Sequence, residues 1–237
     1  MKKIIFLTLA LALIAGAASA QSVVASKHDL RAIGGGTPIG TGLVQVCVTC
    51  HTPHQATTAN AQDPLWNHTL SATNFATVYG SATMNAAPSP LGAAVAGSAT
   101  TSHLCLSCHD GTISVLSMYK QPVLGGTPAA AALAGYTAGA MNNTLAAYIG
   151  TDLSDDHPVN FTFNAALATA DGGLNSPASV TCVGVAVPCV IPLFPGTGAL
   201  TQTVQCASCH NVHNPANVPF LRMDNTGSAL CLACHIK

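Results

Sequence analysis

The chain has 237 residues, of which 6% are charged and 5% aromatic, and its formal net charge is −1. An ordinary soluble domain carries about 25% charged residues, so this surface is neutral, covered or packed against something. The balanced charge, without basic runs, argues against nucleic acid as a partner. Ten Cys and ten His stand out instead, and they direct the search for function.

Residues 1–20 have the form of a secretory signal peptide. Lys2 and Lys3 precede an apolar stretch from Ile4 to Ala15, and small residues follow up to Ala20. A membrane anchor is the alternative, but the stretch is short for one. We predict cleavage after Ala20 and an exported chain, extracellular or at the outer cell surface, with the periplasm as the alternative. No segment of the mature chain is long and apolar enough to span a bilayer.

Eight of the ten Cys fall into four copies of the pattern C-x-x-C-H, the attachment signal of c-type haem. Two thiols at this spacing reach two vinyl groups of one porphyrin from a short helical turn, and the next His binds the iron. Zinc sites and redox C-x-x-C pairs are alternatives, but neither requires His after the second Cys in every copy. We predict four covalently bound haems, attached through Cys47, Cys50, Cys105, Cys108, Cys206, Cys209, Cys231 and Cys234, with His51, His109, His210 and His235 as proximal ligands.

The remaining pair, Cys182 and Cys189, lies in a stretch that contains Gly and Pro. Because free thiols are a liability in an exported protein, a local disulfide between them is the favoured interpretation. A cross-link to another subunit is the alternative.

Four haem irons need four ligands besides the proximal ones, and the chain offers six more His. An internal repeat narrows the choice. The first and third motifs each have a further His three residues after the proximal one, His54 and His213. Each half also has a His ahead of its first motif, His28 and His157. These four are the predicted distal ligands.

Two other His and the Met residues are weaker candidates. His68, close to the single Trp, is an alternative to His28, although a packed, hydrogen-bonded His explains it equally well. His103 is the weakest, because Ala229 occupies the matching position of the other half. Met ligation ranks second, because a lone Met in apolar surroundings is more often packing; the candidates are Met84, Met118, Met141 and Met223.

The spacing of His54 and His213 has a geometric consequence. Residues three apart lie on neighbouring positions of one helical face, so neither can bind the same iron as its proximal His from the opposite side. Each would bind a neighbouring haem instead. The spacing therefore predicts haems in near contact, which electron hopping needs.

The fold class that we expect is a multihaem cytochrome c of mostly irregular coil, with short helices at the haem motifs and little strand. Gly pairs and fourteen Pro interrupt regular structure throughout, although 129–148 has room for a longer helix and 180–191 for a short hairpin. Four stacked haems would form the core. We predict two dihaem lobes, 21–121 and 148–237, joined by an Ala/Gly/Thr-rich segment, 122–147.

Four stretches, Cys47–His54, Leu104–Thr112, Asp156–Val159 and Val204–Lys237, resemble the doubled-CXXCH multihaem c-type cytochromes. The four motifs and the low-charge, Thr/Ala/Gly-rich body are similar to the extracellular tetrahaem cytochromes of the OmcE type. The resemblance covers most of the mature chain, but its specific motifs lie around the haem sites. It implies bis-His haems stacked along a filament that conducts electrons, in which one subunit lends an axial His to its neighbour.

We expect electron transfer without catalysis, because the spare His suffice to close every iron and an enzyme haem keeps one axial position open. The leading hypothesis is a head-to-tail homopolymer, an extracellular filament that passes electrons to redox partner cytochromes or extracellular acceptors. A discrete periplasmic or cell-surface tetrahaem carrier is the alternative, although carriers usually dock through charged patches. A haem reductase ranks third. His28, or else His68, is expected to bind a haem of the next subunit.

Overall fold

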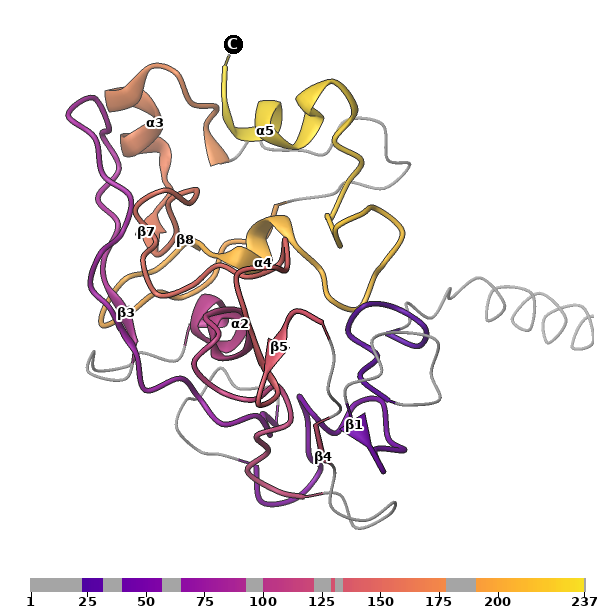
Figure 1. Cartoon of the computed structure of the whole chain (residues 1–237). Helices are drawn as coiled ribbons and strands as arrows, with labels where there is room; N and C mark the ends of the chain where they lie inside the picture. Colours follow the sequence, from indigo (N-terminus) through magenta and orange to yellow (C-terminus); the bar gives the residue numbers. More distant parts are fainter. Residues whose placement is uncertain are drawn as a thin grey trace, which may run out of the picture.

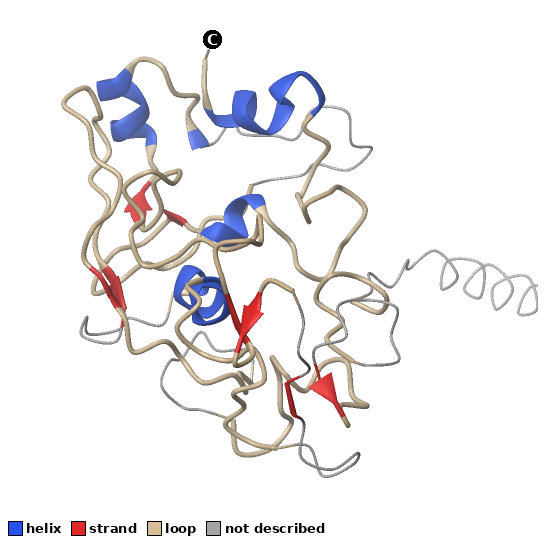
Figure 2. Cartoon of the chain, viewed as in Figure 1, coloured by secondary structure: helices blue, strands red, loops and turns tan. Residues whose placement is uncertain are grey.

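The computed structural model describes residues 23–31, 40–56, 65–92, 100–121, 129–130, 134–177 and 191–236. Loops and turns dominate, with a few short helices and two-residue strands (Figure 2). The mostly irregular chain expected from the Gly and Pro content is confirmed. The predicted signal peptide, Cys182 and Cys189 lie outside the described residues, and so does most of the hairpin expected at 180–191.

Three of the helices contain haem motifs. These are α2 (Thr101–His109), α4 (Cys206–Cys209) and α5 (Ala229–Cys234), and the last follows a 3-10 turn, η2 (Thr226–Ser228). The Thr100 hydroxyl caps α2 by accepting the His103 N–H at 3.3 Å. The first motif forms a turn, in which the His51 N–H donates to the Cys47 carbonyl at 2.8 Å. A fourth helix, α3 (Ala165–Asp171), lies outside the motifs.

The strands form four antiparallel pairs, β1–β4, β2–β3, β5–β6 and β7–β8. Their bounds are β1 Gly40–Thr41, β2 Asn74–Phe75, β3 Leu91–Gly92, β4 Ala129–Ala130, β5 Tyr136–Thr137, β6 Ala140–Met141, β7 Phe161–Thr162 and β8 Thr203–Val204. In Figure 1, α3 and α5 lie at one end of the molecule, β1 and β4 at the other, and α2 and α4 between them.

The expectation of a longer helix over 129–148 is wrong. This segment contains β4 and the β5–β6 hairpin instead. The two residues at the hairpin tip, Ala138 and Gly139, have φ of 50° and 83°, as the tightest hairpin turns require. The high Ala content favours a helix, but glycines at the tip and at Gly135 (φ 89°) favour turns.

The two halves of the chain contact each other closely. The Cys206 N–H at the start of α4 donates to the Ser102 hydroxyl in α2 at 2.9 Å. The Leu153 N–H donates to the Thr77 carbonyl at 3.1 Å. The boundaries of the predicted lobes stay a prediction.

Apolar side chains form three small clusters, each beside haem motifs. Phe161, Phe163, Ile191, Val204, Met223, Leu230 and Ala233 form the first; Leu43, Val48, Val115, Leu116 and Met118 the second; Phe75, Leu91, Leu106 and Leu153 the third. Met118 and Met223 are buried packing residues here. Within the described ranges, no helix has the length and apolar character needed to cross a membrane. A core of stacked haems stays a prediction.

Asn160 joins three segments through its buried amide. Its Nδ2 donates to the carbonyls of Ser89 and Pro90 at 2.9 and 3.2 Å and to the Thr197 hydroxyl at 2.9 Å. Its Oδ1 accepts the Thr197 N–H and the Gln205 side-chain amide, both at 3.1 Å. The backbone φ of 59° suits Asn or Gly.

We predict that Asn160→Gly destabilises the haem-loaded protein by about 3 kcal/mol, because it leaves several buried polar groups without partners. Glycine accepts the same φ, so the loss of stability reports the missing side-chain amide of Asn160. Chemical denaturation followed by circular dichroism measures it. The exposed Asn143 provides the control, since Asn143→Ala should change stability by less than about 0.5 kcal/mol. Equal effects of both variants would contradict the role of Asn160.

Candidate haem-binding sites

The second motif presents its three haem-binding side chains from α2. Its proximal residue, His109, ends the helix, and the Nδ1 atom of its ring lies 2.7 Å from the Ala147 carbonyl. A metal-binding His commonly donates one ring N–H to such an oxygen, which fixes the ring and directs the other nitrogen to the metal. The Nε2 atom of His109 is therefore the one directed to an iron.

His28 lies opposite His109 in the same chain. The two ring centroids are 6.1 Å apart, and the edge of the Phe220 ring packs on His28 at 4.6 Å. The Nδ1 atom of His28 is buried with no hydrogen-bond partner. Burial, and then the nearby His109, lower the pKa of His28 to about 4, so the ring is neutral at pH 7, as metal ligation requires.

The separation of these two rings fits a shared iron. A metal–imidazole bond is about 2.0 Å long, so imidazoles on opposite sides of one iron have centroids about 6 Å apart. Each ring is free to rotate about the line that joins the two rings through the iron, so the angle between the ring planes can vary. Three pairs of predicted ligands have this separation: His28–His109 at 6.1 Å, His51–His213 at 6.1 Å and His157–His235 at 6.4 Å.

The pair His51–His213 joins the first motif to the residue three places after the third proximal His. The rings are nearly parallel, at 18°. The Trp66 ring stands edge-on to His51 at 6.2 Å. In the pair of the fourth motif, the Nδ1 atom of His157 lies 2.9 Å from the Pro158 carbonyl. The arrangement thus brings together six of the eight predicted iron ligands.

The other two predicted ligands, His210 and His54, are not brought together. The Nδ1 atom of His210 lies 2.9 Å from the Pro219 carbonyl, which leaves Nε2 for a metal. No further imidazole in the described part of the chain is in ring contact with His210. The His54 side chain is exposed.

The two weaker His candidates each direct at least one ring nitrogen at a protein oxygen, although the Nδ1 atom of His103 is buried without a partner. In His68, which is buried, Nδ1 lies 2.7 Å from the Thr69 carbonyl and Nε2 lies 3.1 Å from the Ser114 carbonyl. In His103, Nε2 lies 2.9 Å from the Ser71 carbonyl. The geometry therefore favours His28 over His68 as a ligand, and it places His28 beside His109, a predicted proximal ligand of its own chain.

The second and third motifs meet where α2 packs on α4. The thiols of Cys105 and Cys206 lie close to each other. Because each haem is attached at its cysteines, the haems of these motifs would have neighbouring edges.

The motif thiols differ in their pKa. Burial raises the pKa of Cys108 above its usual range and that of Cys209 to about 11, whereas contact with Cys105 lowers the pKa of Cys206. Within the described ranges, no three His, Cys or Asp side chains gather as a protein-only metal site requires. Thioether attachment to a porphyrin needs no stable thiolate.

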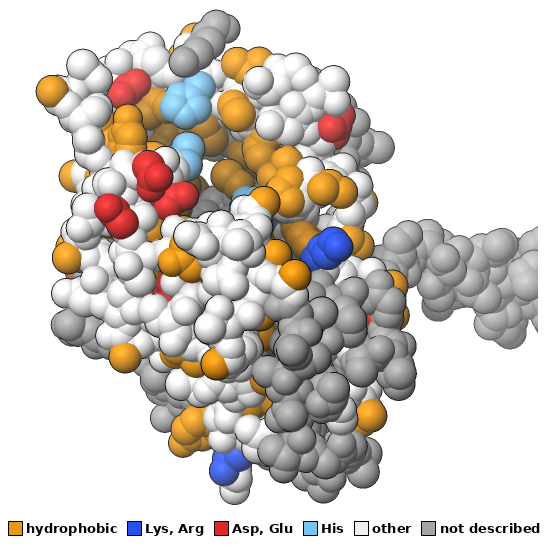
Figure 3. Space-filling view, viewed as in Figure 1, with side chains coloured by type: hydrophobic (Ala, Val, Ile, Leu, Met, Phe, Trp, Pro, Cys, Tyr) orange, Lys and Arg blue, Asp and Glu red, His pale blue; other side chains and the backbone are white. Residues whose placement is uncertain are grey.

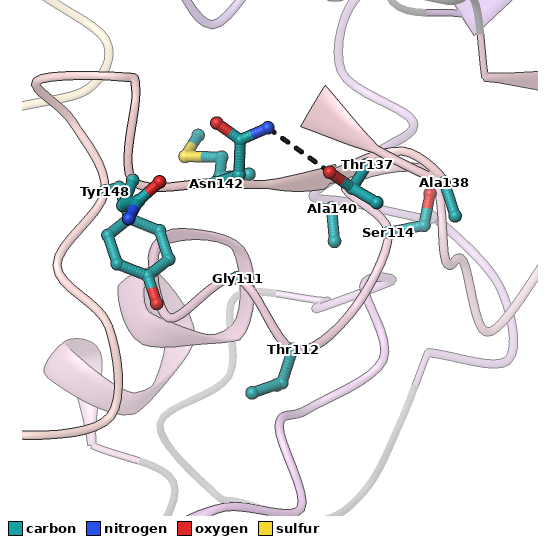
Figure 4. A pocket seen from close by; sticks show the side chains of 10 residues that line it. Gly111, Thr112, Ser114, Thr137, Ala138, Ala140, Asn142 and Tyr148 are labelled. Carbon is teal, nitrogen blue, oxygen red and sulfur yellow. Dashed lines mark hydrogen bonds between the residues drawn. The ribbon is translucent and has the colours of Figure 1, made fainter. Parts of the chain in front are cut away.

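The surface near the C-terminal end suits an apolar ring. Figure 3 shows His side chains in a hollow that hydrophobic side chains surround, with a cluster of acidic side chains beside it. A separate pocket of about 530 Å³ opens beside α2, between the turn at Gly111 and the β5–β6 hairpin (Figure 4). Its described lining contains no His or Cys, but it includes Met141, one of the weaker candidate ligands.

The groups that orient the predicted ligands could not be predicted from the sequence. The carbonyls of Ala147, Pro158 and Pro219 hold ring nitrogens, and a backbone oxygen has no sequence signature. The pairing of His51 with His213 was open to prediction only in part, because the i, i+3 spacing indicates a neighbouring haem without saying which one.

Residues 199–237, which contain the third and fourth motifs, match the family model of the doubled CXXCH motif. A comparison with curated proteins found no match. The family match supports a multihaem c-type cytochrome that works in electron transfer, and the CXXCH motifs indicate covalently bound c-type haem.

A spectroscopic test can distinguish His28 from His68 as the sixth ligand of a haem. We predict that His28→Ala turns one haem per molecule from low-spin to five-coordinate, high-spin iron, because its sixth ligand is lost. His68→Gln should leave every haem low-spin, since the His68 ring already contacts two carbonyls. Visible and electron paramagnetic resonance spectra of the haem-loaded variants measure both. High-spin iron in His68→Gln, with none in His28→Ala, would reverse the assignment.

Proposed function

We propose that this chain is a tetrahaem c-type cytochrome that conducts electrons along bis-His haems as a subunit of an extracellular filament. The observation that carries the proposal is the state of the predicted ligands. Three pairs of imidazoles lie at the separation of a shared iron, while no imidazole of the described chain is in ring contact with His210, and His54 is exposed.

The haem iron, when bound, supplies a one-electron couple between its ferric and ferrous states. The paired His residues would hold the iron from two sides, and the carbonyls of Ala147 and Pro158 orient the rings of His109 and His157 for that role. An iron held by two His would leave no position for a substrate, which supports an electron carrier over an enzyme.

Close spacing between haems supports conduction through the chain. His210 and His213 are three residues apart but would serve different irons, because His213 faces His51. The contact of Cys105 with Cys206 adds a second junction, between the second and third motifs. These two junctions would link three of the four haems into one path for electrons.

A second copy of the chain is the proposed source of the missing ligand. The exposed His54 of one subunit would bind the iron held by His210 of the next, so each junction between subunits would also join two haems. The structure thus points to His54, in place of the expected His28 or His68, as the ligand that crosses. A chain with 6% charged residues also offers a nearly neutral surface for burial against copies of itself.

The proposed setting is outside the inner membrane. The signal peptide predicted at 1–20 supports export, and c-type haems at such close spacing suit transfer to redox partner cytochromes or extracellular acceptors. A discrete carrier remains the other candidate and is an outcome of the test below.

We predict that the purified haem-loaded protein forms uniform filaments by electron microscopy, with low-spin iron in its visible spectrum. His54→Ala should abolish the filaments and turn one haem per chain high-spin, because the crossing ligand is lost. The neighbouring exposed residue Gln55 provides the control. Its backbone φ is 56°, which Asn tolerates, so Gln55→Asn should polymerise normally.

Two results would contradict this proposal. Monodisperse wild-type particles with four low-spin haems would identify a discrete carrier, in which His54 and His210 pair within one chain. Filaments of His54→Ala with four low-spin haems would show that another group binds the iron at His210.

A further inference from the structure

Two carboxylates are fully buried in the described chain, and both lie next to ligands of the second haem motif. Asp29 follows His28 and is 0% exposed; Asp110 follows His109 and is 1% exposed. A buried charge acts on its surroundings with little screening. Whether each carboxylate has a counter-charge therefore decides its effect.

Asp29 is neutralised by an arginine. The Arg31 guanidinium donates from Nε to Oδ1 at 2.8 Å and from its Nη2 to Oδ2 at 2.7 Å. This two-point hydrogen bonding lowers the pKa of Asp29 to about 2. It is the single ion pair formed by the described residues, and its two charges largely cancel at the distance of a haem.

Asp110 has hydrogen-bond donors but no cation. Its Oδ2 accepts the hydroxyls of Ser71 and Thr112, and its Oδ1 accepts the Thr112 N–H at 2.9 Å. Neutral donors stabilise a carboxylate without cancelling its charge at longer range. In the described ranges, no Lys or Arg lies at ion-pair distance from it.

The backbone holds this carboxylate in place. Gly111 has a φ of 73°, and a Cβ there would lie 2.4 Å from the Tyr148 ring and 2.6 Å from the Met141 carbonyl. Figure 4 shows this turn leading from α2 to Thr112, with the Tyr148 ring beside it. Glycine therefore lets the chain fold back so that Thr112 reaches Asp110.

Ser71 is fixed as well. Its N–H donates to the Ser107 hydroxyl at 3.0 Å, and its carbonyl lies 2.9 Å from Nε2 of His103. Both partners belong to α2, so the helix that carries the second motif also orients the Asp110 network. His103 therefore has a structural role, because its ring holds the backbone of Ser71 in place.

The charge of Asp110 acts on the groups that would hold the haem. Asp110 directly follows the predicted proximal ligand His109, and its carboxylate lies within electrostatic range of His109 and Cys108. The other titratable groups in electrostatic contact with Asp110 or His109 are His28, His68 and His210, and Asp29 beside His28 is paired with Arg31. None of them cancels a buried negative charge at Asp110.

We propose that Asp110 is a redox-tuning residue, which stabilises the ferric over the ferrous state of the second-motif haem and gives it the lowest reduction potential of the four. Ferric haem carries one more positive charge than ferrous haem, so an unpaired buried anion favours it. The proposal rests on haem attachment at the second motif. It does not depend on polymerisation.

The test is a spectroelectrochemical titration of the haem-loaded full chain at pH 7. Asp110→Asn should shift the lowest-potential component positive, by about tenfold in the equilibrium constant, or 59 mV for one electron. Asp152→Asn is the matched control, because it removes the same charge from an exposed site, where solvent screens it. It should leave that component in place.

Two further variants keep the outcome clear. Arg31→Gln leaves Asp29 as a second unpaired buried carboxylate and should shift the same component negative, even where Asp110→Asn fails to take up haem. His28→Ala, through its high-spin signal, identifies that component as the second-motif haem. Two outcomes would overturn the proposal, provided that haem content and low-spin spectra are unchanged. The potential of the lowest-potential component stays in place in Asp110→Asn, or it moves equally in Asp152→Asn.

Discussion

One constraint relates separate parts of the chain, the separation of about 6 Å that two imidazoles would need to share an iron. Three pairs of predicted ligands have this separation, and each joins parts of the chain far apart in sequence. His28 reaches the end of α2, and His213 reaches back to the first motif. The regular secondary structure of the fold is compatible with these three His pairs. The β-pairs are two residues long, and the helices hold only one to three turns.

Polar side chains do much of the work that a large apolar core does in other proteins. Asn67 resembles Asn160 in this respect: its amide donates to the carbonyls of Val48 and Lys120 at 2.6 and 2.9 Å and accepts the Lys120 N–H at 2.7 Å. Both amides satisfy backbone groups that a sheet would otherwise pair. Small apolar clusters and buried amides thus position segments whose sequence favours neither helix nor strand.

The local features of this chain could be predicted from its sequence, and the long-range ones could not. Spacing alone indicated the four motifs and the short helices that contain three of them. The internal repeat placed His28 and His157 in like positions, and the structure shows each facing the proximal ring of a motif in its own half. The repeat does not extend to the other pair, because His213 faces His51 while His54 stays exposed. Propensity failed at the Ala-rich segment before Tyr148, where positive φ at two adjacent residues makes a hairpin.

The unusual composition and the electrostatics of the second motif are connected. A protein with many surface charges surrounds each buried group with a field that partly averages out. Here, 6% of residues are charged, and in the described part of the chain one of two buried carboxylates is already paired. An unpaired anion at Asp110 then has few competitors, so one side chain is able to set the order of potentials among neighbouring haems. The same scarcity of charge that suits the surface to contact with copies of itself makes the interior sensitive to a single carboxylate.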